Sequence, residues 1–418
     1  MLEPRPTMKT PTLGEAMTPA EAMKWALILA RRGAGFVSPN PMVGCVIVDR
    51  EHKFVTGGWH QKIGEAHAEV DAIDRFSLVR GAKENIAGCH FYVTLEPCSH
   101  EGRTGSCARA LAALKPASVT YAVMDPNPMV SGQGGKILNE AGVSAVCLAD
   151  ARAWPAMPEK PIESGVQIDL VEEAEDLIEI FLWSMRNQGT DAKPFVTVKI
   201  ASSLDGRVAM HTGESQWITG EQAREKGHRL RLEHDAVIVG RKTVETDNPS
   251  LNVRLDDATG HVNSVIVVDP KGKIIERLMD FNIAKVRPPE RILVCVQKGL
   301  VSEKAVERGK ELGFKVFEVG GSKEGVVDLP ELLVKVRALG ITGVYIEGGA
   351  GTVAPFLDAD LVNRLHIFMA TSILGGKYAT GWSDLCGVKT LAEIWKLQRQ
   401  RVKLIGPDLH ITGRLDLT

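Results

Sequence analysis

The pattern of apolar and polar positions predicts alternating helices and strands over residues 18–150. Thr18, Pro19 and Glu21 mark a helix start, with a cap, a proline at the first helical position and a capping-box acid. Apolar residues then recur at helical spacing until two glycines end the segment. Further strands are expected at 43–49, 54–57, 90–95, 118–124 and 144–148, and helices at 68–76, 107–114 and 136–141. This alternation predicts a three-layer α/β domain.

The alternation weakens over residues 151–193 and then resumes. Three prolines mark the start of a connector, and a charged helix is expected near 170–186. Strands follow at 195–200, 236–239, 264–268, 291–296, 316–319, 343–347, 364–369 and 409–412, with helices at 221–233 and 329–338. The pattern therefore predicts a loose tail (1–17), a first domain (18–150), a connector (151–193) and a second α/β domain (194–418).

Composition and charge narrow the class of partner. The chain of 418 residues is 44% hydrophobic and 24% charged, with a net charge of −2, which is typical of a globular protein and gives no field that favours nucleic acid. No apolar run reaches the roughly 20 residues that span a bilayer, and the amino terminus lacks the apolar core of a secretory signal. Seven cysteines are an odd number for a disulfide framework. We expect a cytoplasmic protein with a small-molecule substrate and neither nucleic acid nor membrane as partner.

A metal motif is the strongest chemical signal. His67 precedes Glu69 by two residues, and Cys98 follows a proline; with Cys107 they supply one imidazole and two thiolates. Three protein ligands leave the fourth position of Zn²⁺ for water, as a catalytic site requires. Glu69 can take the proton of that water and pass it to a ring nitrogen and a leaving amine, as in zinc deaminases. The sequence predicts a Zn²⁺ site with Glu69 as the catalytic acid and base.

Two other histidines compete for roles near this site. His100 is a possible ligand, but a substrate-side or solvated position is preferred because it lies in a loop. His60 is interpreted as structural or substrate-lining. Asn40 can read a pyrimidine edge through hydrogen bonds, and it is nearly as well explained as a turn residue between two prolines.

The motifs of the first domain resemble the deaminase domain of bifunctional riboflavin biosynthesis proteins. The matching stretches are Ser38-Pro39-Asn40-Pro41, Gly58-Trp59-His60, His67-Ala68-Glu69-Val70 and Thr94-Leu95-Glu96-Pro97-Cys98, followed by Gly102-Arg103-Thr104. Gly105 and Ser106 stand where this family usually has two prolines. Because the ligand register is unchanged, we expect a looser loop with the metal retained.

The second half resembles the reductase domain of the same family, which has a dihydrofolate-reductase-like fold. The matching stretches include Val198–Arg207, Gly213–Thr219, His228-Arg229-Leu230-Arg231, Asp247–Leu251 and Glu347-Gly348-Gly349. The expected fold class is therefore a cytidine-deaminase-like three-layer domain followed by a dihydrofolate-reductase-like α/β domain.

Family membership would imply two consecutive reactions on a phosphoribosyl pyrimidine. Zinc hydroxide would deaminate 2,5-diamino-6-(5-phosphoribosylamino)pyrimidin-4(3H)-one, and NADPH would then reduce 5-amino-6-(5-phosphoribosylamino)uracil to the ribitylamino product. The preference for NADPH over NADH rests mainly on the resemblance; Arg241 and Lys242 offer charge for a 2′-phosphate, although such exposed pairs are usually solvated. The resemblance also implies a homo-oligomer.

The resemblance assigns the reductase residues by motif. The substrate is expected to contact Ser215, Arg231, Leu251, Arg254 and Glu347, and the cofactor Ala201, Trp217, Thr243, Asp247, Gly349, Ala350, Gly351 and Thr352. The two arginines suit a phosphate-bearing ligand because guanidinium binds phosphate in a bidentate manner. Lys199 is a possible proton donor, although a lysine on a strand is more often at the surface or ion-paired.

Three other interpretations stay open. A nucleic-acid base deaminase is disfavoured because no basic stretch with interspersed aromatic residues is present. A zinc-stabilised regulatory module would not need the intact Glu69. The third is a chain in which only one domain is active. Because of Gly105-Ser106, the deaminase is the domain expected to be inactive in that case.

Overall fold

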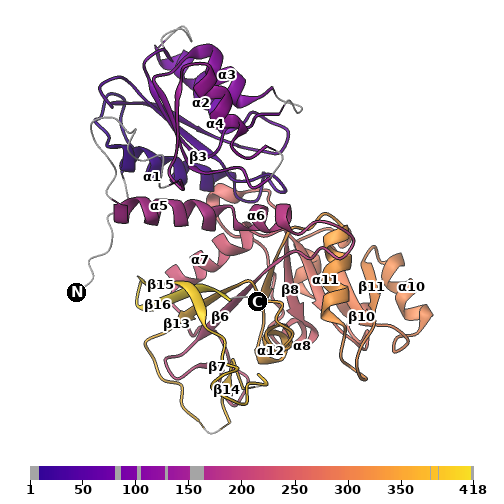
Figure 1. Cartoon of the computed structure of the whole chain (residues 1–418). Helices are drawn as coiled ribbons and strands as arrows, with labels where there is room; N and C mark the ends of the chain where they lie inside the picture. Colours follow the sequence, from indigo (N-terminus) through magenta and orange to yellow (C-terminus); the bar gives the residue numbers. More distant parts are fainter. Residues whose placement is uncertain are drawn as a thin grey trace. The chain divides into compact units, whose positions relative to one another are not determined.

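The computed structural model describes residues 9–80, 86–100, 105–127, 130–150, 164–376, 378–384 and 386–415. The chain divides into two compact units, Met1–Arg186 and Asn187–Thr418, which are drawn in Figure 1. Across the described ranges, no helix combines the length and apolar character needed to cross a membrane.

Unit 1 is built on a five-stranded mixed sheet in the order β2-β1-β3-β4-β5. The strands are β1 (Gly44–Val48), β2 (Phe54–Trp59), β3 (His90–Leu95), β4 (Ser118–Val123) and β5 (Ser144–Cys147). β1 pairs antiparallel with both β2 and β3, whereas β3, β4 and β5 are parallel. The carboxyl end of β3 therefore faces the same edge as that of β4, which places the residues after Leu95 at that edge.

Helices cover both faces of this sheet, as the three-layer prediction requires. They are α1 (Pro19–Ala30), α2 (Ala68–Arg80), α3 (Cys107–Leu114), α4 (Gln133–Glu140), α5 (Ser164–Leu177) and α6 (Glu179–Arg186). One core joins α1 and α5 to Val46 and Tyr92, and the other joins α2, α3 and α4 to Ile47 and Phe91. Because neighbouring strand residues point to opposite faces, each strand contributes to both cores.

The two segments that flank the predicted first domain, the tail and the connector, both contact the rest of unit 1. Gly14 and Met17 donate backbone hydrogen bonds to Phe54 and His52, so the described part of the expected tail is attached to β2. The charged helix expected in the connector occurs as α5 and α6, and Leu170 of α5 is buried against the α1 core. Residues 151–163 of the predicted connector lie outside the described residues.

Unit 2 is built on a nine-stranded sheet in the order β11-β10-β9-β8-β12-β6-β13-β16-β15. Its strands are β6 (Phe195–Ser202), β8 (Ala236–Gly240), β9 (Ser264–Val268), β10 (Ile292–Gln297), β11 (Lys315–Val319), β12 (Gly343–Glu347), β13 (Arg364–Met369), β15 (Leu397–Ile405) and β16 (Asp408–Leu415). β15 and β16 are antiparallel additions to an otherwise parallel sheet. The short strands β7 (Arg207–Ala209) and β14 (Thr380–Gly381) form a separate pair.

Helices also cover both faces of the second sheet. They are α7 (Glu221–Leu232), α8 (Arg241–Asp247), α9 (Asn282–Lys285), α10 (Glu303–Glu311), α11 (Leu329–Ala338) and α12 (Ala350–Asp358). α11 and α12 share a core with Val198 and Ile346, whereas α7, α8 and α10 share one with Val237 and Tyr345. The parallel strands β8, β12 and β6 are neighbours, so their carboxyl ends form one continuous edge.

Candidate active sites

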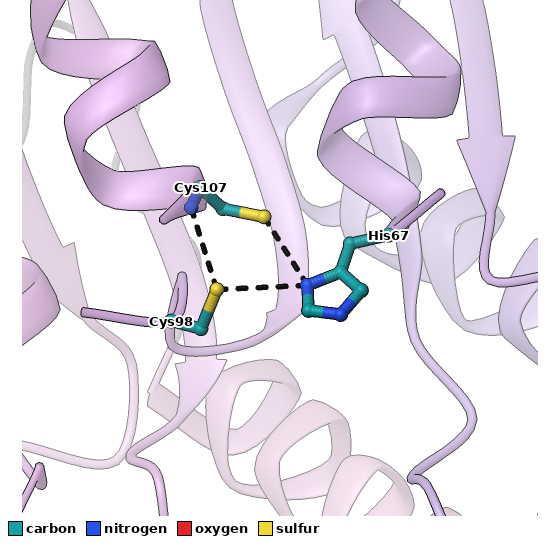
Figure 2. A group of neighbouring side chains, drawn as sticks. All are labelled: His67, Cys98 and Cys107. Atoms are coloured by element: carbon teal, nitrogen blue, oxygen red, sulfur yellow. Dashed lines mark hydrogen bonds between the residues drawn. The ribbon is translucent and has the colours of Figure 1, made fainter. Parts of the chain in front are cut away.

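Three elements of unit 1 bring the predicted metal ligands together. His67 immediately precedes α2, Cys98 follows β3, and Cys107 is the first residue of α3. Their candidate ligand atoms all lie within 4.8 Å of one another. Figure 2 shows that the His67 Nδ1 atom faces both sulfur atoms, at 3.5 Å from Cys98 Sγ and 3.4 Å from Cys107 Sγ.

These separations fit a single zinc ion. Zn–S bonds of about 2.3 Å and Zn–N bonds of about 2.0–2.1 Å at a tetrahedral angle place sulfur and nitrogen about 3.5 Å apart. The imidazole and two thiols are also the donor types that zinc prefers. His100 is exposed and is not among the clustered residues, so the described part of the chain offers three ligands here.

The electrostatics of the ligand thiols favour ionisation of one of them. A hydrogen bond from the Cys107 thiol, supported by His67, lowers the pKa of Cys98 to about 4. The hydrogen bond to Cys98 and burial raise the pKa of the Cys107 thiol. A bound metal cation would favour ionisation of both thiols.

Glu69 lies in the first turn of α2, two residues after His67, and is 4% exposed. Burial, together with the nearby Cys98 charge, raises the pKa of its carboxyl to about 7. A carboxyl with a pKa near neutrality can both accept and donate a proton during one reaction. The environment of Glu69 therefore suits the acid and base role predicted from the sequence.

Asn40 and His60 form a hydrogen-bonded chain beside the ligands. His60 Nδ1 lies 3.0 Å from the carbonyl oxygen of Ala66, which can only accept, so Nδ1 carries the proton. His60 Nε2 must then accept from the Asn40 side-chain nitrogen at 3.2 Å. This fixes the orientation of the Asn40 amide. His60 is buried and packs edge-on against His67, in agreement with its interpretation as structural or substrate-lining.

In unit 2, Glu347 ends β12 and forms the centre of a charge network. Arg231 of α7 donates from Nε and Nη2 to the Glu347 carboxylate at 2.8–3.2 Å, and from Nη1 to the Asn252 carbonyl oxygen at 2.5 Å. Lys199 of β6 lies opposite Glu347 in the strand register. Burial alone would raise the pKa of Glu347, but the charges of Arg231 and Lys199 outweigh it and lower that pKa. The site therefore holds an ionised carboxylate.

His228 lies between the two arginines that the sequence assigned to the substrate. Its Nδ1 accepts from the Arg254 backbone N–H at 3.2 Å and lies 3.4 Å from Arg231 Nη1, and Arg254 Nε lies 3.4 Å from its Nε2. Burial and the two guanidinium charges lower the pKa of His228 to about 4. No role was predicted for His228, although its position three residues before Arg231 on a helix places both on one face.

The glycine-rich segment after β12 lies close to the end of β8. Gly349 caps α12, whose first turn contains Ala350, Gly351 and Thr352. A Cβ atom at Gly240 would lie 2.6 Å from Thr352 Oγ1, so only glycine allows this approach. The exposed amides of a helix start can bind a phosphate. Thr243 and Asp247 lie in α8, which begins directly after Gly240 at the end of β8.

Leu251 is held in an unusual backbone conformation. Its φ of 51° lies in the left-handed region, which is uncommon for a leucine, and its side chain is 6% exposed. The Asn263 side chain donates to its carbonyl oxygen at 3.1 Å, and Arg287 donates to the Asn263 carbonyl oxygen at 3.1 Å. The loop that leads to Arg254 is thereby fixed to the body of unit 2.

Three residues to which the sequence analysis gave a role lie apart from the network of Arg231 and Glu347. They are Ser215, Trp217 and Arg241. Ser215 and Trp217 lie between β7 and α7, and no hydrogen bond among the described residues joins either to Glu347 or Arg231. The Trp217 ring is 66% exposed and faces the Arg224 guanidinium. Arg241 is paired with Glu245 and Asp269, so its charge is already shared with two carboxylates. Ala201, near the end of β6, lies at the same sheet edge as Glu347.

Comparisons with known proteins cover nearly the whole chain. Residues 17–123 match the family described as the cytidine and deoxycytidylate deaminase zinc-binding region, and residues 194–411 match the RibD C-terminal domain. Riboflavin biosynthesis protein RibD of Bacillus amyloliquefaciens is 36% identical over 94% of this chain and 95% of its own length. The Escherichia coli (strain K12) protein of the same name is 34% identical over 94% and 98%.

Solved structures show the same two-domain similarity. Acinetobacter baumannii RibD is 30% identical, with a TM-score of 0.70 over 95% of this chain and 99% of that one. A Thermotoga maritima diaminohydroxyphosphoribosylaminopyrimidine deaminase/5-amino-6-(5-phosphoribosylamino)uracil reductase is 28% identical, with a TM-score of 0.72 over the same shares. These matches agree with the two expected folds, in the expected order.

Proposed function

The chain belongs to the family of riboflavin biosynthesis protein RibD and carries both of its domains, and we propose that it catalyses two consecutive steps of riboflavin biosynthesis. The first step deaminates 2,5-diamino-6-(5-phosphoribosylamino)pyrimidin-4(3H)-one in unit 1. The second reduces 5-amino-6-(5-phosphoribosylamino)uracil to the ribitylamino product in unit 2. The observation that carries the proposal is the convergence of His67, Cys98 and Cys107 on one point beside the buried Glu69.

In the deamination, His67, Cys98 and Cys107 hold the metal and Glu69 moves the protons. Zinc, when bound to three such ligands, lowers the pKa of a water molecule to about 7 and makes hydroxide available at neutral pH. Glu69 accepts the proton of the attacking water and delivers protons to the ring nitrogen and the departing amine, which leaves as ammonia. Asn40, oriented by His60, presents its amide oxygen to N–H groups of the pyrimidine.

In the reduction, unit 2 positions a ring-opened imine and excludes water from it. NADPH, when bound, would supply a hydride to the imine carbon, and a proton taken up by the imine nitrogen would complete the amine. Arg254 is exposed and available to the substrate phosphate, whereas Arg231 holds the Glu347 carboxylate in place at the substrate. Ser215 and Leu251 complete the proposed substrate contacts.

The cofactor is proposed to lie along the edge formed by the ends of β6, β8 and β12. Ala201 and Trp217 would contact it from one side, and Thr243 and Asp247 from α8. Gly349, Ala350, Gly351 and Thr352 would bind its phosphates through the start of α12. Support comes from the close approach of Gly240 to Thr352, which places the start of α12 beside the end of β8; the amides of a helix start can bind a phosphate.

Separate assays of zinc content and of each turnover test the proposal. We expect about one zinc per chain, deamination without NADPH, and NADPH oxidation only after deamination. Zinc binding without deamination, but with NADPH oxidation on the already deaminated compound, would restrict the function to the reductase. No turnover of either compound would refute the assigned substrate.

A cytoplasmic location and a homo-oligomeric state are part of the proposal. The seven cysteines form no disulfide, which is the usual state in a reducing compartment. The oligomer rests on family resemblance, and sedimentation of the purified chain would test it.

A further inference from the structure

The segment between the two cysteine ligands ends in Gly105 and Ser106. Residues 101–104 of this segment lie outside the described residues, but Ser106 is described and is 4% exposed. It is the N-cap of α3, with φ of −62° and ψ of 122°. Proline fixes φ near −65°. Ser106 thus keeps the backbone angle of a proline without having its ring.

The Ser106 hydroxyl joins the two ligand segments. It donates to the carbonyl oxygen of Cys98 at 2.8 Å and accepts from the Arg109 backbone N–H at 3.3 Å. One hydroxyl therefore connects the turn after β3 with the first turn of α3. Only a group that both donates and accepts can make this connection.

Two backbone contacts run alongside this connection. The Ala108 N–H donates to the same Cys98 carbonyl oxygen at 3.1 Å, and the Cys107 N–H donates to Cys98 Sγ at 3.3 Å. Both contacts require α3 to start at a fixed distance from Cys98. Among the described residues of this segment, the hydroxyl of Ser106 adds a side-chain contact that helps to hold this distance.

We propose that Ser106 is a positioning residue of the metal centre, which fixes the spacing of Cys98 and Cys107 before zinc binds. This inference rests on the proposed zinc site. Partners that orient metal ligands contribute about 10–100-fold to metal affinity, because a site that is already ordered loses less entropy on binding. In this chain, the hydrogen bonds of the Ser106 hydroxyl join the segment after Cys98 to the start of α3.

The alternative is that Ser106 serves only as a helix cap. Loss of a serine or threonine cap destabilises a helix wherever the helix lies. Thr18 offers a matched control in the same unit, because its hydroxyl accepts from the Glu21 N–H at the start of α1. If Ser106 is only a cap, its removal should lower stability as removal of Thr18 does. If Ser106 positions the ligands, its removal should also weaken zinc binding, and removal of Thr18 should not.

The test compares Ser106→Ala, Ser106→Thr and Thr18→Ala in the full chain. Zinc affinity is measured by competition with a chromogenic chelator, and the melting of the metal-free protein is measured in parallel. We expect Ser106→Ala to weaken zinc affinity about 10-fold, Ser106→Thr to remain within about 3-fold of the parent, and Thr18→Ala to lower melting without weakening zinc binding.

Three outcomes would overturn the inference. Ser106→Ala could bind zinc within 2-fold of the parent, Ser106→Thr could lose as much affinity as Ser106→Ala, or Thr18→Ala could weaken zinc equally. In each case the parent chain would still bind zinc and deaminate, so the proposed function would stand. A parent chain that binds no zinc would refute both.

Discussion

The metal centre of unit 1 and the charge network of unit 2 are assembled over very different lengths of chain. His67 and Cys107 are 40 positions apart, and both belong to motifs that can be read by eye. Arg231 and Glu347 are 116 positions apart and meet only because α7 packs over the end of β12. The residues of the first site can be recognised from local sequence motifs. The residues of the second site are brought together only by the packing of a large sheet and its helices.

The two sites also differ in how charge is stabilised. In unit 1, a buried acid lies beside two thiols, and burial raises the pKa of Glu69 to about 7. In unit 2, fixed cations already surround Glu347 and keep its pKa low. Loss of a side chain should therefore impair chemistry in the first site and stability or substrate binding in the second.

The largest effect is expected from Glu69→Gln. Without a proton carrier, deaminase kcat should fall about 10²–10⁴-fold, while zinc content and reductase turnover stay at the parent level. Steady-state assays of each step on the same preparation, with metal analysis, make the measurement. Equal loss of both activities would contradict independent sites.

Arg231→Ala should have the next largest effect, and mainly on unit 2. Arg231 and Glu347 are only 12% and 14% exposed, so removing one partner leaves a buried charge and should cost about 3–5 kcal/mol of stability. Calorimetry and zinc analysis are the measurements, and zinc content should not change. Adding Glu347→Ala should recover part of the loss; fully additive losses would show that the two residues do not interact.

A smaller effect is expected from His228→Leu. Without the imidazole, Arg254 loses its two contacts with His228, and reductase KM for the phosphoribosyl substrate should rise roughly 10-fold with kcat little changed. His228→Asn, which keeps an acceptor, should recover part of this. Arg229→Gln, beside it and paired with Asp257, is the control. A fall in kcat at constant KM would contradict a positioning role.

A change of pH alone, with no substitution, should lower the stability of unit 2 in acid. Burial lowers the pKa of His366, and of His410 to about 4, and their stacked rings lie 2.9 Å apart at Nδ1 and Nε2. The unfolded chain binds protons at the usual pKa of 6.5, so stability is full above that pH and falls as pH drops toward 4. Calorimetry from pH 7 to pH 5 should show lower melting of unit 2, and His410→Gln should flatten the dependence. Melting of unit 2 that does not change with pH would refute this.

Much of the fold could be predicted because its strands are apolar and regular. β3, α3, β9, α11, β12 and β13 have the bounds expected from periodicity. β15 was missed because most of its side chains are exposed, and it is a strand only through pairing with β16. α10 was also missed, since its buried positions are few among charged ones. Exposed elements carry little hydrophobic signal, so sequence patterns detect them poorly.

The sequence by itself determined the three candidate metal ligands, the acid beside them and the order of the two domains. The candidate ligands and the acid can be read from local motifs because they lie after the end of a strand and at the starts of two helices. Only the tertiary structure decided that Arg231 is ion-paired with Glu347, that His228 lies between two guanidinium groups, and that Ser106 connects the two cysteine segments. Those roles depend on distances between elements far apart in the chain, and no local pattern of residues encodes such distances.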